Sequence, residues 1–258
     1  MKAAQGVGMN FSIGVGRVAL LACEVIRSIF SVRIDWSELL KQVHFIGVRS
    51  VFVVLTTGAS TGMVFCAQTL YQLHKVKMDS AALSVVGIAM TGDLGPVLAG
   101  LMVAGRVGAG ITAELGTMRV TEQIDAMRTM STHPIDYLVV PRFIATVLAM
   151  PLLTVLASVV GIFAAYILLG SVLGVDQASS LKHMYYYTDT GDVLMGLIKA
   201  FVFGALISLI SCYRGLNCDK GAEGVGKATN EAVVQSCISI LVSNFFLTLL
   251  LRPILKSF

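Results

Sequence analysis

The chain has 258 residues, of which 56% are hydrophobic and only 13% charged, and its formal net charge is +4. Soluble domains carry about 25% charged residues, so this chain has too little polar surface to stay soluble as a monomer. The composition excludes a cytosolic enzyme, a disordered chain and a nucleic-acid-binding module. Five widely spaced cysteines predict neither a disulfide framework nor a metal site. We interpret residues 1–258 as a single-domain integral membrane protein.

The first apolar stretch, Phe11–Phe30, is ambiguous. At 100° per residue its polar side chains fall within an arc of about 100°. They are Arg17, Glu24, Arg27, Ser28 and Ser31. This pattern favours an amphipathic helix lying in the membrane interface, within an N-terminal region of residues 1–47. Two alternatives remain open, namely a sixth membrane span and a lipoprotein signal ending at Cys23, whose apolar core Arg17 interrupts.

Five further segments are long and apolar enough to cross about 30 Å of hydrocarbon as helices. They are Val48–Leu73, Ala81–Ala104, Phe143–Leu169, Val193–Ile210 and Val233–Leu251. The predicted fold class is therefore an all-α integral membrane protein with a five-helix transmembrane core over residues 48–251. With the N-terminus inside, the internal segments hold twelve Lys and Arg residues and the external ones five. The positive-inside rule thus predicts that the N-terminus is inside and the C-terminus outside.

Polar and small residues are regularly spaced along the first span. Four polar residues form a stripe about 60° wide, and they are Thr57, Thr61, Gln68 and Gln72. Beside the stripe, Gly58 and Gly62 form a GxxxG motif, and Gly100, Ala104 and Gly108 repeat small residues along the second span. Small residues let helices approach closely, so helix packing explains this pattern. The alternative is a polar lining for a cavity that admits lipid headgroups.

Asp93 lies about twelve residues into the second span, near the middle of the bilayer. A carboxylate at that depth is costly and usually faces protein or a water-filled cavity. Gly92, Gly95 and Pro96 predict a kink beside it. We interpret Asp93 as the lining of a substrate cavity, with a paired structural carboxyl as the alternative. Lys199 could be its partner, although an amine nearer the outer surface could also extend toward water.

The internal segment between the second and third spans predicts a helix over Ile111–Met130, ended by His133-Pro134. Its charged residues are Glu114, Arg119, Glu122, Asp125 and Arg128. Opposite charges at i,i+3 pair Arg119 with Glu122 and Asp125 with Arg128. Such a helix suits docking to a soluble partner, while packing against its own membrane domain is the alternative.

Sequence motifs for catalysis are missing: the chain has neither HExxH nor GxSxG. Gly221–Lys227 matches GxxxxGK, but Ala228 stands where a nucleotide-binding loop needs Ser or Thr. The segment also follows a membrane span rather than a buried strand. We therefore expect no nucleotide or other cofactor on this chain, and we interpret the motif as a glycine-rich turn leading into the fifth span.

Several runs resemble the MlaE-type permeases of ABC systems that move phospholipids between bacterial membranes. The runs are LGPVLAGLMVAGRVG from Leu94, AELGTMRVTEQIDA from Ala113, YLVVPR from Tyr137 and GAEGVGKAT from Gly221. The resemblance covers about residues 48–251. It implies a non-enzymatic permease subunit of the bacterial inner membrane, with its N-terminus cytoplasmic and its C-terminus periplasmic.

The resemblance also implies partners and sites. The partners are a second permease copy, cytoplasmic ABC ATPase subunits that bind the ATP, a periplasmic MCE-domain ring protein and often a STAS-domain protein. The helix over Ile111–Met130 takes the place of the family's coupling helix, which assigns coupling to its five charged residues. Lipid lies between the two permeases, at positions that correspond here to Phe65, Gln72, Leu73, Asp93 and Leu94.

One departure from the family pattern affects the lipid site. Arg-Glu often precedes Leu-Gly-Pro in the family, whereas this chain has Gly92-Asp93, which puts a headgroup contact by arginine there in doubt. Two other classes of function remain open. A secondary transporter or channel would work without ATP, and a passive scaffold would tolerate replacement of Asp93 or of the loop charges.

Overall fold

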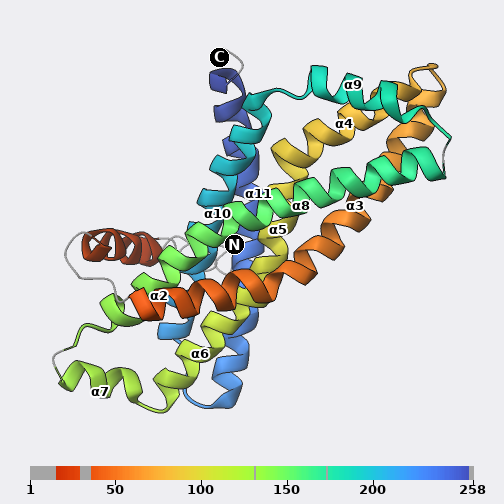
Figure 1. Ribbon diagram of the computed structural model, residues 1–258. Coiled ribbons are helices and arrows are strands. Elements are labelled where there is room, and N and C mark those ends of the chain that lie inside the picture. Colours follow the sequence, from red (N-terminus) through yellow and green to blue (C-terminus); the bar gives the residue numbers. More distant parts are fainter. Residues whose placement is uncertain (1–15, 30–35, 131, 173, 256–258) are drawn as a thin grey trace, which may run out of the picture.

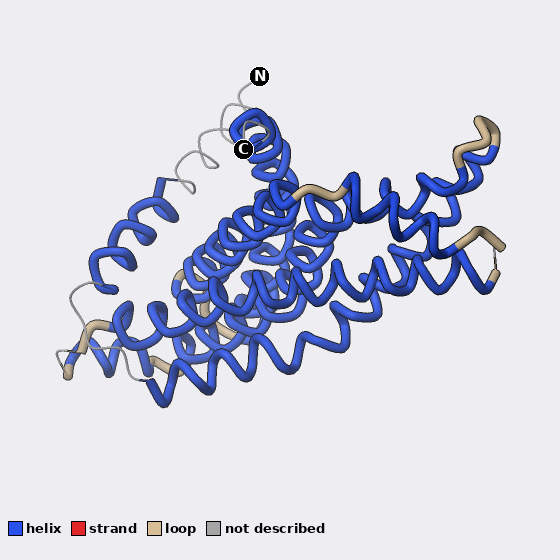
Figure 2. Tube along the Cα trace, turned by 45° about the horizontal axis from the view of Figure 1, so that its top comes forward, coloured by secondary structure: helices blue, strands red, loops and turns tan. Residues whose placement is uncertain are grey.

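The computed structural model describes residues 16–29, 36–130, 132–172 and 174–255, and these ranges form helices and no strand (Figures 1 and 2). The α-helices are the segment 16–29, α2 (Trp36–Val43), α3 (Arg49–His74), α4 (Ala82–Ala89), α5 (Gly95–Val103), α6 (Ala109–Val120), α7 (Gln123–Thr129), α8 (Val140–Ser171), α9 (Gln177–Tyr187), α10 (Thr190–Leu216) and α11 (Ala222–Leu255). Short π-helical turns join several of them end to end, at His44–Val48, Met90–Leu94, Ala104–Gly108 and Ile135–Val139.

Five continuous helical stretches are long and apolar enough to cross a membrane, which confirms the five predicted spans. They are Trp36–His74, Asp79–Val120, Ile135–Ser171, Thr190–Leu216 and Ala222–Ile254. Each is longer than its predicted apolar core, because the helices continue past the hydrophobic run into polar sequence. The GxxxxGK segment shows this clearly: Gly221 adopts φ +91°, but α11 begins at Ala222, so the motif is mainly helix rather than the turn we expected.

The GxxxG motif of α3 packs against α8, which runs alongside it in Figure 1. A Cβ on Gly58 would lie 2.7 Å from the carbonyl oxygen of Ala157, and one on Gly62 would collide with the backbone of Gly161. The two backbones therefore touch, as expected for small residues in membrane helices. The small residues of the second span contact other helices, since Gly100 faces Phe203 of α10 and Ile240 of α11.

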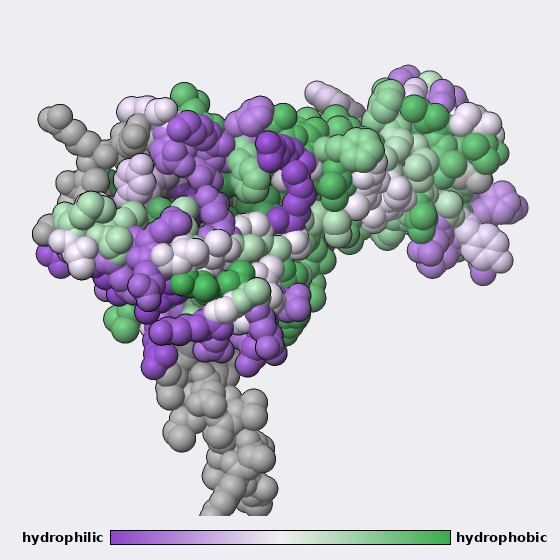
Figure 3. All heavy atoms as spheres, turned by 90° about the horizontal axis from the view of Figure 1, so that it is seen from below, coloured by the Kyte–Doolittle hydropathy of each residue, from purple (hydrophilic) through white to green (hydrophobic). Residues whose placement is uncertain are grey.

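The two ends of the molecule differ in chemistry. Because five spans alternate in direction, the α6–α7 segment and the α10–α11 connection share one end, and the α3–α4 connection and α9 share the other (Figure 1). Seen from below Figure 1, hydrophilic side chains gather over the α6–α7 end, while hydrophobic ones cover much of the flank (Figure 3). Helix α2 and the C-terminal end of α11 likewise lie toward opposite ends of the molecule (Figure 1).

The N-terminal helix, residues 16–29, packs one face on the span bundle. Leu21 and Val25 are buried in the main hydrophobic core, and the hydroxyl of Ser28 donates to Asp136 at 2.5 Å. Arg17 and Arg27, of the predicted polar stripe, are exposed, while Ser31 lies outside the described residues. The segment is helical, but Ser28 of the predicted polar stripe is buried while Leu20 and Ile26 are exposed. The amphipathic helix in the membrane interface therefore stays a prediction.

Candidate functional site

The second span breaks its α-helical pattern at Met90–Leu94, which places a π-helical turn around Asp93. Pro96 explains part of this break, because it has no N–H to donate to the carbonyl of Gly92 one turn earlier. The amine of Lys199 donates to that carbonyl at 3.0 Å instead. Ser158 of α8 donates to the carbonyl of Met90 at 2.9 Å. The predicted kink is thus a real irregularity whose carbonyls are satisfied by neighbouring helices.

Lys199 is the ion-pair partner of Asp93, as the sequence suggested, and it does not extend toward water. Its side chain is fully buried, and its amine contacts the Asp93 carboxylate and the Thr248 hydroxyl, the latter at 2.9 Å. Thr248 lies 3.2 Å from the same carboxylate oxygen of Asp93. The three side chains come from three different spans, so this polar network ties η3 (Met90–Leu94), α10 and α11 together in the membrane.

The two members of the ion pair differ in exposure, and this decides what the site can do. The Asp93 side chain is 44% exposed, whereas Lys199 is completely enclosed. One oxygen of Asp93 receives the contacts from Lys199 and Thr248, and no described residue hydrogen-bonds the other. A carboxylate oxygen therefore faces outward at a depth where charge is expensive, and it can accept a hydrogen bond from a bound polar group.

The other four predicted lipid residues do not all gather around this carboxylate. Phe65, Leu73 and Leu94 are partly buried and pack against a second hydrophobic cluster, which includes Cys66, Leu70, Leu83, Met90 and Leu169. Gln72 is exposed on α3, and among the described residues no hydrogen bond joins it to Asp93. The structure thus groups three apolar members and leaves the two polar ones, Gln72 and Asp93, on separate helices.

The predicted polar stripe of the first span has two parts. Thr57 uses its hydroxyl within its own helix, donating to the carbonyl of Val53 at 2.9 Å. Gln68 and Gln72 are exposed. The upper part of the stripe is therefore available to a ligand, and the Thr57 part is already satisfied by helix hydrogen bonding.

The helix predicted as one segment over Ile111–Met130 is two helices, α6 and α7. The chain turns at Thr121-Glu122, where Glu122 adopts the left-handed conformation with φ +59°. The prediction of a single helix was wrong, because a left-handed glutamate carries no marker in sequence. The break also removes the expected Arg119–Glu122 pair. Arg119 instead contacts Asp125 at 2.7 Å, and Arg128 contacts the same oxygen at 3.3 Å.

Glu114 leaves this group of charges and pairs with Arg142 of α8 at 3.0 Å. Arg142 is buried, and its Nε and Nη1 have no partner among the described residues. Sequence reasoning missed Arg142 and Thr248 as site residues. For Arg142 the signal was a lone charge beside Pro141 at the start of an apolar run, whereas Thr248 had none.

Comparison with known proteins identifies the family. The chain matches the family described as Permease MlaE over residues 39–250. This chain belongs to the MlaE permease family. Among MlaE relatives, a probable ABC transporter permease protein of Rickettsia felis is 43% identical over 240 residues, which are 93% of each chain. A probable ABC transporter permease protein of Synechocystis sp. is 39% identical and covers 90% of this chain and 88% of its own.

A plant relative extends the comparison. The chloroplastic protein TRIGALACTOSYLDIACYLGLYCEROL 1 of Arabidopsis thaliana is 36% identical over 231 residues, which are 90% of this chain and 66% of the plant protein. Together with the five apolar helices, these matches make the chain a multi-pass membrane protein and a permease subunit. The break at Asp93 and the α6–α7 segment are thus features of an MlaE permease.

Proposed function

We propose that this MlaE permease is the membrane subunit of an ATP-driven transporter that moves phospholipids between the inner and outer membranes of a bacterium. The observation that carries the proposal is the open carboxylate oxygen of Asp93, held at a helix break in mid-span by the buried Lys199. The plant relative, which is 36% identical, is named after a diacylglycerol lipid, and this name supports a lipid cargo.

The cargo site lies between two copies of the permease. Asp93 meets polar atoms of the headgroup region, with Gln72 as a second polar contact, and Phe65, Leu73 and Leu94 offer apolar surface to the acyl chains. The exposed apolar face of α11, with Phe245, Phe246, Leu249 and Leu250, is surface that a second copy or lipid covers. Lys199 positions Asp93 rather than the cargo, because it is completely enclosed.

The α6–α7 end docks a cytoplasmic ABC ATPase. Its exposed charges include Glu122 and Asp125. Hydrophilic side chains gather at this end of the molecule (Figure 3). This chain binds no ATP and catalyses no reaction. Binding of ATP by the partner favours one arrangement of the two permeases over another, and only that difference in affinity drives the cycle. A periplasmic MCE-domain ring and a STAS-domain protein complete the proposed assembly.

Co-purification tests the assembly. The protein is extracted from its native membrane in mild detergent, and the proteins and lipids that come with it are identified by mass spectrometry. We expect an ATPase subunit and bound phospholipid. Recovery of neither from an intact membrane complex would favour a secondary transporter or a scaffold.

Two sets of variants test the sites separately. Glu122→Lys with Asp125→Lys should release the ATPase and leave the helix content unchanged, and Glu24→Lys, an exposed charge on the N-terminal helix, is the control. Asp93→Asn should reduce bound phospholipid about tenfold, the worth of one charge-assisted hydrogen bond, while the ATPase stays bound. If the ATPase remains on the double variant, the docking surface is elsewhere.

A further inference from the structure

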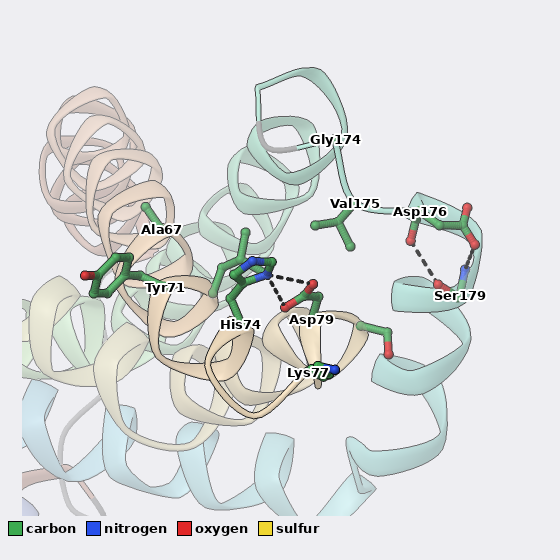
Figure 4. A pocket seen from close by; sticks show the side chains of 11 residues that line it. Ala67, Tyr71, His74, Lys77, Asp79, Gly174, Val175, Asp176 and Ser179 are labelled. Atoms are coloured by element: carbon green, nitrogen blue, oxygen red, sulfur yellow. Dashed lines mark hydrogen bonds and ion pairs between the residues drawn. The ribbon is translucent and has the colours of Figure 1, made fainter.

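A cavity of about 740 Å³ opens at the end of the molecule opposite α7, between the end of α3 and the start of α9. Figure 4 shows His74 and Asp79 between the two helices, with Asp176 and Ser179 on the α9 side. The proposed cargo site does not include any of these residues. The cavity is therefore separate from the proposed cargo site, and the proposed transport mechanism gives its lining residues no role.

The cavity and the proposed cargo site use different faces of α3. At 100° per residue, Ala67, Tyr71 and His74 fall within about 60° of one another, and they point about 100–180° away from Phe65 and Gln72. The first three line the cavity, whereas Phe65 packs against the second hydrophobic cluster. A ligand in the cavity therefore does not occupy the surface that carries the cargo residues.

The lining changes from apolar to charged. Leu70 is buried in the second hydrophobic cluster and Val175 packs against it, whereas Lys77 and Asp176 are exposed. An amphiphile fits such a lining, with its chains along the apolar side and its head at the charged side. The site lies at the ends of membrane-spanning helices, where lipid headgroups are found.

Four Asp, His and Lys side chains line the cavity, of which two pair with each other and two remain for a ligand. His74 and Asp79 are paired at 3.0 Å. Lys77 makes no ion pair with any described residue, and its backbone is fixed in the left-handed region at φ +53°. Asp176 caps α9 by accepting hydrogen bonds from the backbone of Ala178 and Ser179, both at 3.2 Å. These bonds leave lone pairs on both of its oxygens.

Asp176 remains ionised over the physiological range. Hydrogen bonds from Ser179, first from its side chain and then from its backbone, together with one from Ala178, hold the pKa of Asp176 below its usual value. The cavity lining therefore includes a carboxylate at Asp176 and an ammonium at Lys77, neither of which forms an ion pair with a described residue.

Helix α9 carries further marks of a membrane surface. Three consecutive tyrosines, Tyr185, Tyr186 and Tyr187, are largely exposed near the start of α10. Tyrosine is enriched where a membrane meets water, because its ring is apolar and its hydroxyl is polar. The same helix packs on α4, where Met184 lies against Gly87. The exposed tyrosines thus place the cavity at the level of the headgroups.

We propose that this cavity binds the headgroup of a zwitterionic aminophospholipid, with its phosphate at Lys77, its ammonium at Asp176 and its acyl chains along Ala67 and Leu70. A headgroup with a phosphate alone satisfies Lys77 and leaves Asp176 without a cation. The site rests on the membrane location of the chain, and it requires neither transport nor an ATPase.

Photo-crosslinking tests the proposal at the cavity itself. The full chain, with benzoylphenylalanine in place of Tyr71, is reconstituted into vesicles of equal parts phosphatidylethanolamine and phosphatidylglycerol, and the captured lipids are identified by mass spectrometry. We expect phosphatidylethanolamine to be enriched about tenfold, the worth of one charge-assisted hydrogen bond to its ammonium. Asp176→Asn should abolish the enrichment while keeping the cap, because Asn is an equally good cap residue. Lys77→Gln should lower the capture of both lipids.

Matched controls separate this site from its surroundings. Asp189→Asn alters the cap of α10, which does not line the cavity, and should keep the enrichment. The same crosslinker at Phe65 reports the proposed cargo site, so either site can fail without the other. Equal capture of the two lipids at position 71, or an enrichment that survives Asp176→Asn, would overturn the proposal. Displacement by soluble glycerophosphoethanolamine at the same concentration would show that the ligand is a free headgroup rather than a lipid.

Discussion

At the scale of single residues, the Asp93–Lys199 pair is unequal in its surroundings. Water or a ligand can reach Asp93, whose side chain is 44% exposed, while Lys199 is enclosed. Removing one partner therefore destabilises the protein by an amount that depends on which charge remains. An unpaired Asp93 keeps an open side, but an unpaired Lys199 is an enclosed ammonium without its counter-ion.

This asymmetry predicts the order of two variants. Asp93→Ala should lower the free energy of unfolding by about 3–5 kcal/mol, because it leaves a buried ammonium without its partner. Lys199→Met should cost less, since it removes the buried charge and keeps much of the volume. Thermal unfolding in detergent, followed by circular dichroism, measures both. The double variant should be more stable than Asp93→Ala alone. Equal losses of stability in the two single variants, which add up in the double variant, would contradict this account.

At the scale of helices, the contact between α3 and α8 depends on the absence of side chains. Gly58→Val should destabilise the protein by about 1–3 kcal/mol or more, because the new Cβ meets the backbone of Ala157, which cannot rotate away. Gly226→Ala is the matched control. It lies in α11 with nothing within 4 Å of the new Cβ, and should be neutral or stabilising by about 0.5–1 kcal/mol. A similar loss in both would mean that helix propensity, not packing, governs these positions.

The helices also show what the sequence could and could not predict. The five spans, the GxxxG contact and the Asp93–Lys199 pair follow from apolar length, small residues and the cost of lone charges in lipid. The turn at Glu122 does not, because a non-glycine residue with positive φ is fixed by tertiary contacts. The Glu114–Arg142 pair and the contact of Thr248 join residues distant in sequence, and local spacing carries no information about such contacts.

At the scale of the whole molecule, an odd number of spans puts the segments before the first span and after the last span on opposite sides of the membrane. Cys218, between α10 and α11, lies on the side of α7, where its thiol is 3.5 Å from the carbonyl of Gly116. Arg252 is exposed near the end of α11 on the other side. The positive-inside rule predicts that Cys218 lies on the cytoplasmic side.

Labelling single cysteines checks this topology. In sealed, right-side-out vesicles, an impermeant maleimide should modify Arg252→Cys and spare Cys218 until the membrane is opened. Burial raises the pKa of the Cys218 thiol, and the thiolate is the reactive form. Its modification should therefore be slow at pH 7 and accelerate as the pH rises, so Asp125→Cys on exposed α7 is the control for access. Labelling of Cys218 and Arg252→Cys from the same side would contradict the five-span arrangement.

The hydrogen bond from Lys199 to Gly92 makes a proline and a lysine, 103 positions apart, dependent on each other. Pro96 has no N–H to donate to the carbonyl of Gly92, and the ammonium of Lys199 on α10 donates the hydrogen bond instead. An alanine at this position would restore the missing amide, which would then share the Gly92 carbonyl with the ammonium of Lys199. Among related permeases, we therefore expect proline at position 96 and lysine at position 199 to be present or absent together.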